Sequence, residues 1–166
     1  MERENIMAFL NDIGSIFEES MNQVIVDDSK ETPVLLMSGR SLFDDDKETG
    51  YSVMIESGEN GYLFFQLLCS IISDVHEEKF AEVNEAIGYI APSLTFGNFV
   101  LVEEGGMIIF RHCYIISEEA DAKEAVAYAI RNLYVLESRA AASGRKLYEL
   151  VKGSCTPEDI KNSLKG

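Results

Sequence analysis

Two pairs of apolar segments, each joined by a short glycine-containing turn, constrain the fold of this chain more than any other feature. The pairs are Tyr51–Glu56 with Tyr62–Ile71, joined by Ser57-Gly58-Glu59-Asn60-Gly61, and Asn98–Val102 with Met107–Ile116, joined by Glu103-Glu104-Gly105-Gly106. Gly and Asn permit the positive φ that tight hairpin turns need. Strands joined in this way run antiparallel, which predicts an antiparallel sheet with helices packed on it, an α+β fold.

Two further strand candidates precede these hairpins. They are a β-branched run at Val24–Val26 and an apolar run at Val34–Met37. In Tyr62–Ile71, every second residue is apolar from Leu63 onward, so these side chains share one face. Met107–Ile116 is apolar on both faces, which favours a position in the interior of the sheet.

Helical periodicity is found in three segments and a helix-start signal in a fourth. The segments are Glu4–Met21, Val75 to just before Pro92, and Glu118–Ala142, and Thr156-Pro157-Glu158-Asp159 is the start signal. Ser117 is the predicted N-cap of the third helix, and Ser143-Gly144 is predicted to interrupt it before the pattern resumes at Leu147. The order of elements predicts a single domain over residues 1–153 and a short C-terminal helical tail over residues 154–166.

The charge excludes some classes of partner. The chain of 166 residues carries 29 Asp and Glu against 14 Lys and Arg, a net charge of -15. Such a surface repels nucleic-acid phosphates and the anionic face of a bilayer, so neither nucleic acid nor a membrane is an expected partner. Neutral or basic partners are favoured. The alternative is that the charge serves only to keep the protein soluble.

The cysteines and the N-terminal residues indicate the compartment. The 3 cysteines form an odd set without a CxxC spacing, and two of them, Cys69 and Cys113, lie in apolar strand candidates where a free Cys is usually a small hydrophobe. The residues from Met1 show no signal-peptide pattern, and the apolar runs are too short for a membrane span. We therefore expect a cytoplasmic protein.

Metal binding is a weak hypothesis. His112 and Cys113 are adjacent on a strand, so their side chains point to opposite faces and do not share a metal easily. Counted from Asp45, Gly50 and Glu56 fall where a calcium-binding loop places its Gly and its bidentate Glu. Lys47, however, takes a position that should supply an oxygen ligand. A solvated loop explains these acids better.

No pattern for catalysis stands out. Cys69 or Cys113 can be drawn into a triad with His76 or His112, but any protein with these residue types permits such a drawing. Neither a Gly-x-Ser-x-Gly elbow nor a Gly-rich phosphate loop with its lysine occurs in the sequence. We expect a protein that is not an enzyme, with no catalytic, metal-binding or cofactor-binding residues and no cofactor.

Apolar side chains on both faces of the strand candidates are the remaining signal. The residues concerned include Phe64, Phe65, Phe110, Tyr114 and Ile116. If helices cover one face, the other face meets a second copy of the chain, the N-terminal helix folded across it, or a segment of a client protein. The simpler alternative is burial within the same domain.

Part of the chain resembles the YbjN-like family of bacterial proteins. The resemblance covers roughly Gly61 to Val151 and depends on three motifs followed by a long Ala-rich helix. The motifs are Val83-Asn84-Glu85-Ala86-Ile87, Gly97-Asn98-Phe99-Val100-Leu101 and Gly106-Met107-Ile108-Ile109-Phe110-Arg111. The family shares the fold of type III secretion chaperones and is often labelled a sensory-transduction regulator. The resemblance implies an antiparallel sheet of about five strands in the order α-β-β-β-α-β-β-α, and the N-terminal third offers one strand more.

The resemblance also implies a function. Members are small acidic proteins, commonly dimeric, that engage a partner and catalyse nothing, and no catalytic residues are carried over. We expect a non-enzymatic protein-binding module, chaperone-like or regulatory, that acts as a homodimer. The alternative is a signalling or regulatory domain that senses a small ligand in a pocket beside the sheet. The sequence predicts no individual partner-binding residue.

Overall fold

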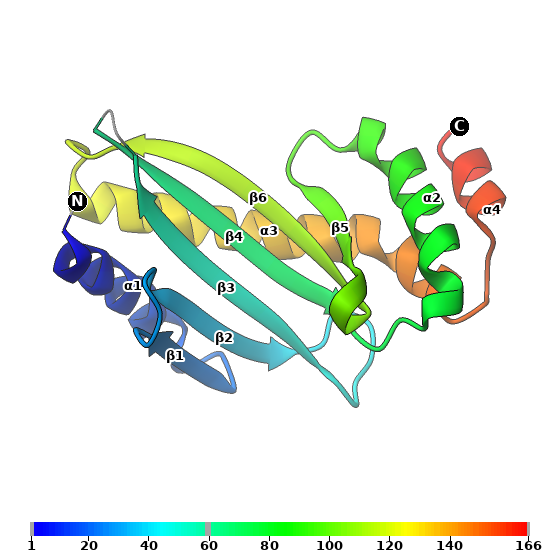
Figure 1. The fold of residues 1–166 in the computed structure, drawn as a ribbon, viewed down its shortest axis with the longest axis horizontal. Coiled ribbons are helices and arrows are strands. Elements are labelled where there is room, and N and C mark those ends of the chain that lie inside the picture. Colours follow the sequence, from blue (N-terminus) through cyan, green and yellow to red (C-terminus); the bar gives the residue numbers. More distant parts are fainter. Residues whose placement is uncertain (1, 59–60, 166) are drawn as a thin grey trace.

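The computed structural model, which describes residues 2–58 and 61–165, contains one six-stranded antiparallel sheet in the order β1-β2-β3-β4-β6-β5 (Figure 1). The strands are β1 Gln23–Asp27, β2 Val34–Arg40, β3 Glu48–Ser57, β4 Tyr62–Ile72, β5 Asn98–Val102 and β6 Met107–Ser117. Both predicted hairpins are present as the adjacent pairs β3–β4 and β5–β6. Glu59 and Asn60 of the first predicted turn lie outside the described residues.

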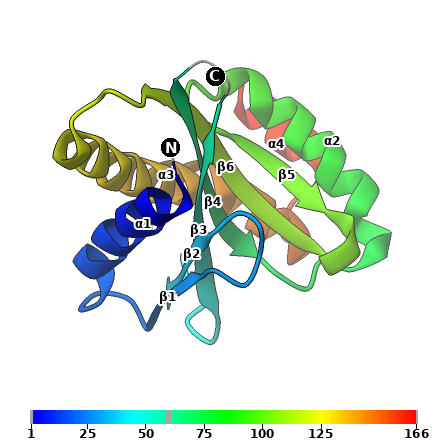
Figure 2. The same cartoon turned by 60° about the vertical axis from the view of Figure 1, so that its left-hand side comes forward.

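Four α-helices pack around this sheet, which confirms the α+β class. They are α1 Arg3–Phe17, α2 Phe80–Ile90, α3 Ala122–Val151 and α4 Pro157–Ser163. Helices α1 and α3 lie together on one face of the sheet, whereas α2 and α4 lie at one end of the molecule beside β5 (Figures 1 and 2). Within residues 2–58 and 61–165, none of the helices is both long and apolar enough to cross a membrane.

The core lies between the sheet and the helices α1 and α3. Leu35, Val53, Phe65 and Phe110 alternate onto this face of the sheet and are completely buried. A stripe along α3 covers them at helical spacing, formed by Ala129, Leu133, Leu136, Ala140 and Leu147. Each Leu, Val or Phe side chain removed from water stabilises the fold by roughly 1.5–3 kcal/mol, so this layer supplies most of the driving force.

The predicted count of about five strands is wrong by one, because Val24–Val26 forms part of a sixth strand. Strand β1 pairs with β2 from Gln23 opposite Ser38 to Asp27 opposite Val34. Two features hold this edge strand: Val24 and Val26 pack against the core, and the Arg3 guanidinium of α1 donates hydrogen bonds to the carbonyl oxygens of Lys30, at 2.9 Å, and of its neighbours in the loop after β1.

Helix α3 differs from its prediction at both places where a boundary was expected. Its N-cap is Asp121, whose carboxylate accepts hydrogen bonds from two backbone N–H groups, and Ser117 ends β6 instead. The helix also runs through Gly144 without interruption. A Cβ at Gly144 would lie 2.7 Å from the Ile71 Cδ1 atom and 3.2 Å from the Phe43 Cζ atom. This glycine therefore serves close packing within the helix and does not end it.

The boundaries of the other helices shift by a few residues. Helix α1 ends at Phe17, before Met21, and α2 begins at Phe80 after a single 3₁₀ turn at Glu77–Lys79. In the C-terminal tail, Thr156 and Asp159 form a reciprocal capping box at the start of α4. Ile160 of α4 is only 2% exposed and α4 packs against α2, so the tail belongs to the packed structure.

Candidate functional site: the open face of the sheet

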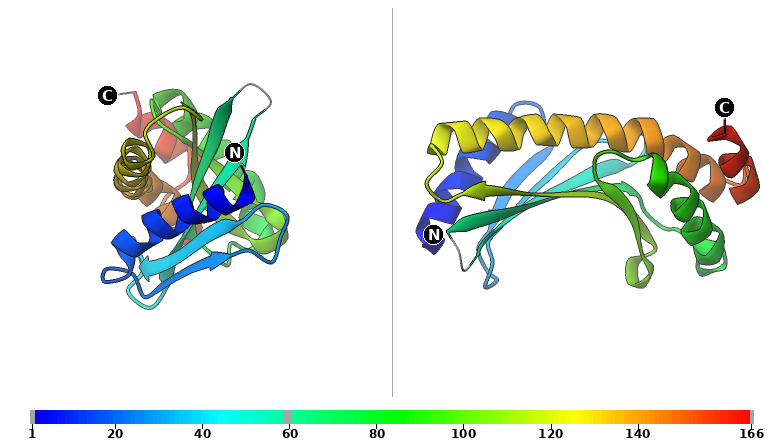
Figure 3. Two further views of the ribbon diagram at one scale, coloured as in Figure 1. Left: turned by 90° about the vertical axis from the view of Figure 1, so that its left-hand side faces the viewer. Right: turned by 90° about the horizontal axis from the view of Figure 1, so that it is seen from above.

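The face of the sheet opposite α1 and α3 is open to solvent. Figure 3 shows α3 lying along one side of the curved sheet, while the other side is concave and carries no helix from the described part of the chain. Strand alternation places apolar side chains on this open face as well. Leu36, Phe64 and Ile115 are 42%, 46% and 58% exposed, which is unusual for large apolar residues in the middle of a sheet.

One half of the open face contains a hollow of about 410 Å³. Its walls are apolar and are formed by residues from all the strands except β1: Leu36, Ser52, Leu68, Val102, Met107 and Ile109. Two small residues, Gly50 and Ser70, leave the space between these walls. The Ser70 hydroxyl donates to the Met107 Sδ atom at 2.8 Å, and no charged side chain lines the hollow.

The other half of the open face projects apolar side chains. Phe64 on β4 is paired directly with Ile115 on β6, and Tyr62 precedes them on β4 with 49% of its surface exposed. The Phe64 ring lies against Gly58, where a Cβ would be within 2.4 Å of the ring. We call Tyr62, Phe64 and Ile115 the knob. Along β4, Phe64 lies about 13–20 Å from Leu68 and Ser70 of the hollow, at roughly 3.3 Å per residue.

The open face is nearly free of the negative charge that dominates this chain. By strand alternation, its acidic residues are Asp27, Glu48 and Glu56, which all lie at or beside strand ends. On β4, β5 and β6 the one charged residue of this face is Arg111, whose Nε donates to the Asn98 Oδ1 atom at 3.3 Å. The chain has 29 acidic residues, so the central part of this face differs in charge from most of the surface.

Two of the alternatives open for the second face can now be compared with the structure. The N-terminal helix does not fold across it: α1 packs on the covered face, where Gly14 lies against Leu35 and Val24. Burial of both faces within the domain is also wrong, because the open face stays exposed. Of the five apolar strand residues singled out in the sequence, only Phe64 lies on the open face, while Phe65, Phe110, Tyr114 and Ile116 point to the helices.

The candidate nucleophiles and histidines are spread over both faces. His112 and Cys113 point to opposite faces as predicted: His112 stacks on Phe96 of the covered side with ring centroids 3.7 Å apart, whereas Cys113 is exposed on the open face. The expectation that Cys113 is a core hydrophobe is therefore wrong. Cys69 is buried, and two causes raise the pKa of its thiol: desolvation, which is the larger, and the nearby charge of Glu137. The raised pKa disfavours the nucleophilic thiolate.

The calcium hypothesis does not fit the backbone. Strand β3 runs from Glu48 to Ser57, so Gly50 and Glu56 lie within one extended strand and are not wrapped around an ion as a binding loop requires. Lys47 pairs with Asp74 at 3.0 Å, and Asp45 pairs with Arg40 at 2.7 Å. Among residues 2–58 and 61–165, no group of three or more His, Cys, Asp or Glu side chains is placed to hold a metal ion.

Sequence reasoning missed the hollow because five strands contribute to it. One signal was present: small residues alternate with large apolar residues on the same strand faces, at Gly50 and Ser52 of β3 and at Leu68 and Ser70 of β4. This pattern leaves space on an apolar surface only if the strands pair in the observed register. The register of β2, which is set by its pairing with β3, is not encoded in any single segment.

Comparisons with known proteins leave the family open. Neither the search of protein-family models nor the search of curated proteins found a match for this chain.

Proposed function

We propose that this chain is a non-enzymatic protein-binding module that acts as a homodimer, and that the two copies meet through their open sheet faces. The observation that carries this proposal is the presence, on one uncovered apolar face, of both a knob and a hollow. Contiguous exposed apolar surface of this kind is typical of interaction sites and rare on free monomers. A chaperone-like or regulatory role for the dimer follows from the resemblance to the YbjN-like family.

The knob and the hollow make the open face self-complementary. In a two-fold dimer the same patch serves both partners, so residue i of one copy meets residue j of the other and the reverse. A two-fold axis passing between the cross-strand pairs Gln66–Cys113 and Leu68–Arg111 lies midway between the knob pair Phe64–Ile115 and the pair Ser70–Ile109 of the hollow. It brings Phe64 and Ile115 of each copy to the hollow of the other.

Charge favours this face over the remaining surface for self-association. Two copies, each with a net charge of -15, repel one another through any surface rich in acids. The acids of the open face are confined to its margin, so the central contact brings no carboxylate against another. We also propose a cytoplasmic location, which is supported by three unpaired cysteines, one of them exposed.

The test is the oligomeric state of the purified chain. We expect native mass spectrometry and light scattering to show a dimer, and Phe64→Glu and Ile109→Glu each to weaken it by about 100-fold, as expected for residues at the centre of an interface. The matched control is Ile16→Glu on α1, which introduces the same charge at an apolar residue that is 56% exposed and leaves the dimer intact. A monomeric wild-type chain, or a dimer that both Phe64→Glu and Ile109→Glu leave unchanged, overturns the proposal.

Cross-linking through cysteine tests the position of the proposed two-fold axis independently. Cys113 is exposed and lies beside the proposed axis, whereas Cys69 is buried and Cys155 is half-buried. A short bis-maleimide is expected to link two wild-type chains through Cys113, and Cys113→Ser abolishes the product while Cys155→Ser retains it. Linkage that depends on Cys155 instead contradicts a contact through the open face.

A further inference from the structure

A second cavity, which shares only Ser70 with the lining of the open-face hollow, lies where three segments converge at one end of the sheet. Its volume is about 310 Å³, at the lower end of the range typical of small-molecule sites. The segments are the loop between β2 and β3, the loop after β4, and the last turns of α3. The charged residues that line the cavity are Asp44, Lys47, Glu48, Asp74 and Lys152, and His76 lies beside them. Two ammonium groups in one cavity are notable in a chain with only 14 Lys and Arg.

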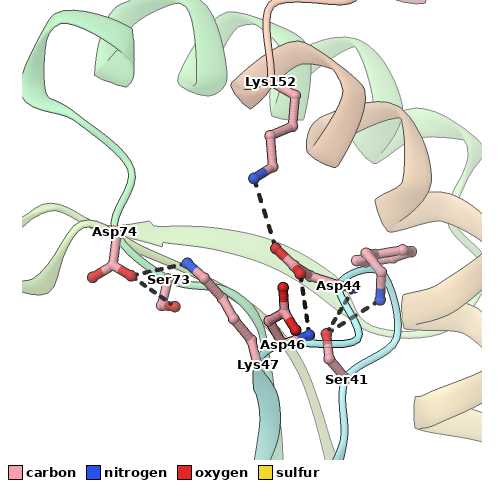
Figure 4. A network of polar contacts seen from close by, with 8 residues as sticks. Ser41, Asp44, Asp46, Lys47, Ser73, Asp74 and Lys152 are labelled. Carbon is pink, nitrogen blue, oxygen red and sulfur yellow. Dashed lines mark hydrogen bonds and ion pairs between the residues drawn. The ribbon is translucent and has the colours of Figure 1, made fainter.

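Four of these charged side chains form two ion pairs across the cavity, and the Glu48 carboxylate accepts a hydrogen bond from the Asn22 amide at 2.7 Å. Lys47 Nζ lies 3.0 Å from Asp74 Oδ2, and Lys152 Nζ lies 3.7 Å from Asp44 Oδ2. Figure 4 shows Lys152 extending from α3 toward Asp44, while Lys47 extends toward Asp74. Each ammonium has three donors and each carboxylate accepts several hydrogen bonds. A single ion-pair partner therefore does not saturate either group. Ammonium donors and carboxylate acceptors remain available to a ligand.

Asp74 is held in a backbone conformation that points to a specific role. Its φ is 62°, the one positive φ at a non-glycine residue in the described part of the chain. Such conformations are uncommon outside glycine and cluster at functional sites. The Asp74 carboxylate is fixed there by Lys47 and by the Ser73 hydroxyl, which donates at 3.4 Å. The interaction with Lys47 lowers the pKa of Asp74, so this group is anionic at neutral pH.

The rest of the cavity offers an apolar and aromatic wall. Phe43 and Tyr148 stack with ring centroids 5.4 Å apart, and Ile71 and Val151 complete this side. The Lys152 ammonium lies 5.4 Å from the centre of the Tyr148 ring. An apolar group placed against this wall thus lies beside cations and anions at once.

We infer that this cavity binds a free amino acid with an apolar or aromatic side chain. Its α-carboxylate lies between the Lys47 and Lys152 ammonium groups, its α-ammonium faces the Asp44 and Asp74 carboxylates, and its side chain packs on Phe43 and Tyr148. A zwitterion offers a group of opposite charge to the ammonium groups and to the carboxylates at once. Sharing the existing ion pairs costs little, because solvent reaches both pairs and exposed ion pairs contribute little to stability. None of the residues assigned to the amino acid here lines the hollow of the proposed dimer contact.

Calorimetry and thermal unfolding with each standard amino acid test this inference. We expect saturable binding of L-phenylalanine or another apolar amino acid to the wild-type chain. Two analogues isolate the charges: 3-phenylpropanoate lacks the ammonium and 2-phenylethylammonium lacks the carboxylate. Each is expected to bind about tenfold more weakly or worse, because one charged hydrogen-bonding partner is lost. An analogue that binds as tightly as the amino acid overturns the inference.

Three variants locate the binding site. Asp74→Asn removes the charge but keeps a residue that tolerates positive φ, and Lys152→Gln removes one cation without shortening the chain greatly. Both are expected to weaken binding about tenfold. The matched control is Lys161→Gln, which breaks a comparable pair with Glu158 at 3.0 Å on α4 and leaves binding unchanged. Binding that none of these variants alters, or no binding of any standard amino acid, overturns the inference, and neither outcome bears on the native mass of the dimer.

Discussion

Phe64 and Phe65 are neighbours on β4, yet they belong to two chemically different surfaces. Phe65 is completely buried beneath α3 and stacks on Tyr114 with ring centroids 5.0 Å apart, whereas Phe64 is 46% exposed on the open face. The same contrast holds for Leu35 and Leu36 of β2, which are 0% and 42% exposed. Residue type alone therefore does not decide which apolar residues of this sheet are buried.

The helices that cover the sheet, and not the residue types of its strands, therefore decide which face becomes part of the core. Both faces of the central strands are apolar, but α1 and α3 supply enough surface for only one of them. The apolar residues on the covered face stabilise the monomer, and those on the open face remain available for association. Three changes to adjacent or facing residues would break or sharpen this comparison.

The largest expected effect is on stability. Phe65→Ala is expected to lower the free energy of unfolding by about 3–5 kcal/mol, the usual cost of deleting a buried Phe. Phe64→Ala should cost less than about 1 kcal/mol in the monomer, because its surroundings are already half solvent. Urea unfolding, at protein concentrations low enough for the chain to be monomeric, measures both losses of free energy. Equal losses for the two variants would contradict the division of the sheet into a folding face and a binding face.

A smaller effect, on association, would sharpen the account of the open face. Phe64→Glu and Ile109→Lys are each expected to dimerise poorly alone, because a charge then faces an apolar surface at both contacts. A mixture of the two should form a heterodimer about 100-fold more stable than either homodimer. One of its contacts is undamaged, and the other places Glu opposite Lys. Native mass spectrometry resolves the species, and a mixture that stays monomeric argues against the knob meeting the hollow.

Sequence patterns were sufficient for the covered face. The alternation of Leu63, Phe65, Leu67, Cys69 and Ile71 predicted one buried face of β4, and all five residues are buried. The glycine-containing turns predicted both hairpins. Local signals of this kind succeed because the period of the strand and the turn geometry are properties of short segments.

Local sequence patterns could not predict the hollow of the open face or the charged cavity. The hollow requires five strands in register, and the cavity joins Asp44, Asp74 and Lys152, which are far apart in the sequence. The acidic stretch from Asp44 suggested a solvated loop, and only the fold shows that Asp44 and Lys47 are paired with partners on other elements. The strand β1 was a candidate from its own residues, but the resemblance implied about five strands, and β1 is short and depends on β2 and on Arg3 for its order.

The smallest expected effect concerns His112 and Cys113, another pair of neighbours on opposite faces. Desolvation on the covered face lowers the pKa of His112 below its ordinary value of 6.5. The unfolded chain therefore binds this proton more readily, so the contribution of His112 to stability is complete above about pH 6.5 and is lost as the pH falls through the lower folded pKa. In urea unfolding between pH 7 and pH 5, His112→Phe is expected to remove part of the wild-type slope, whereas Cys113→Ser on the open face should retain it. A slope that His112→Phe leaves unchanged would mean that this ring is hydrated in the folded chain, and that the covered face is less tightly closed beside Phe96 than its burial indicates.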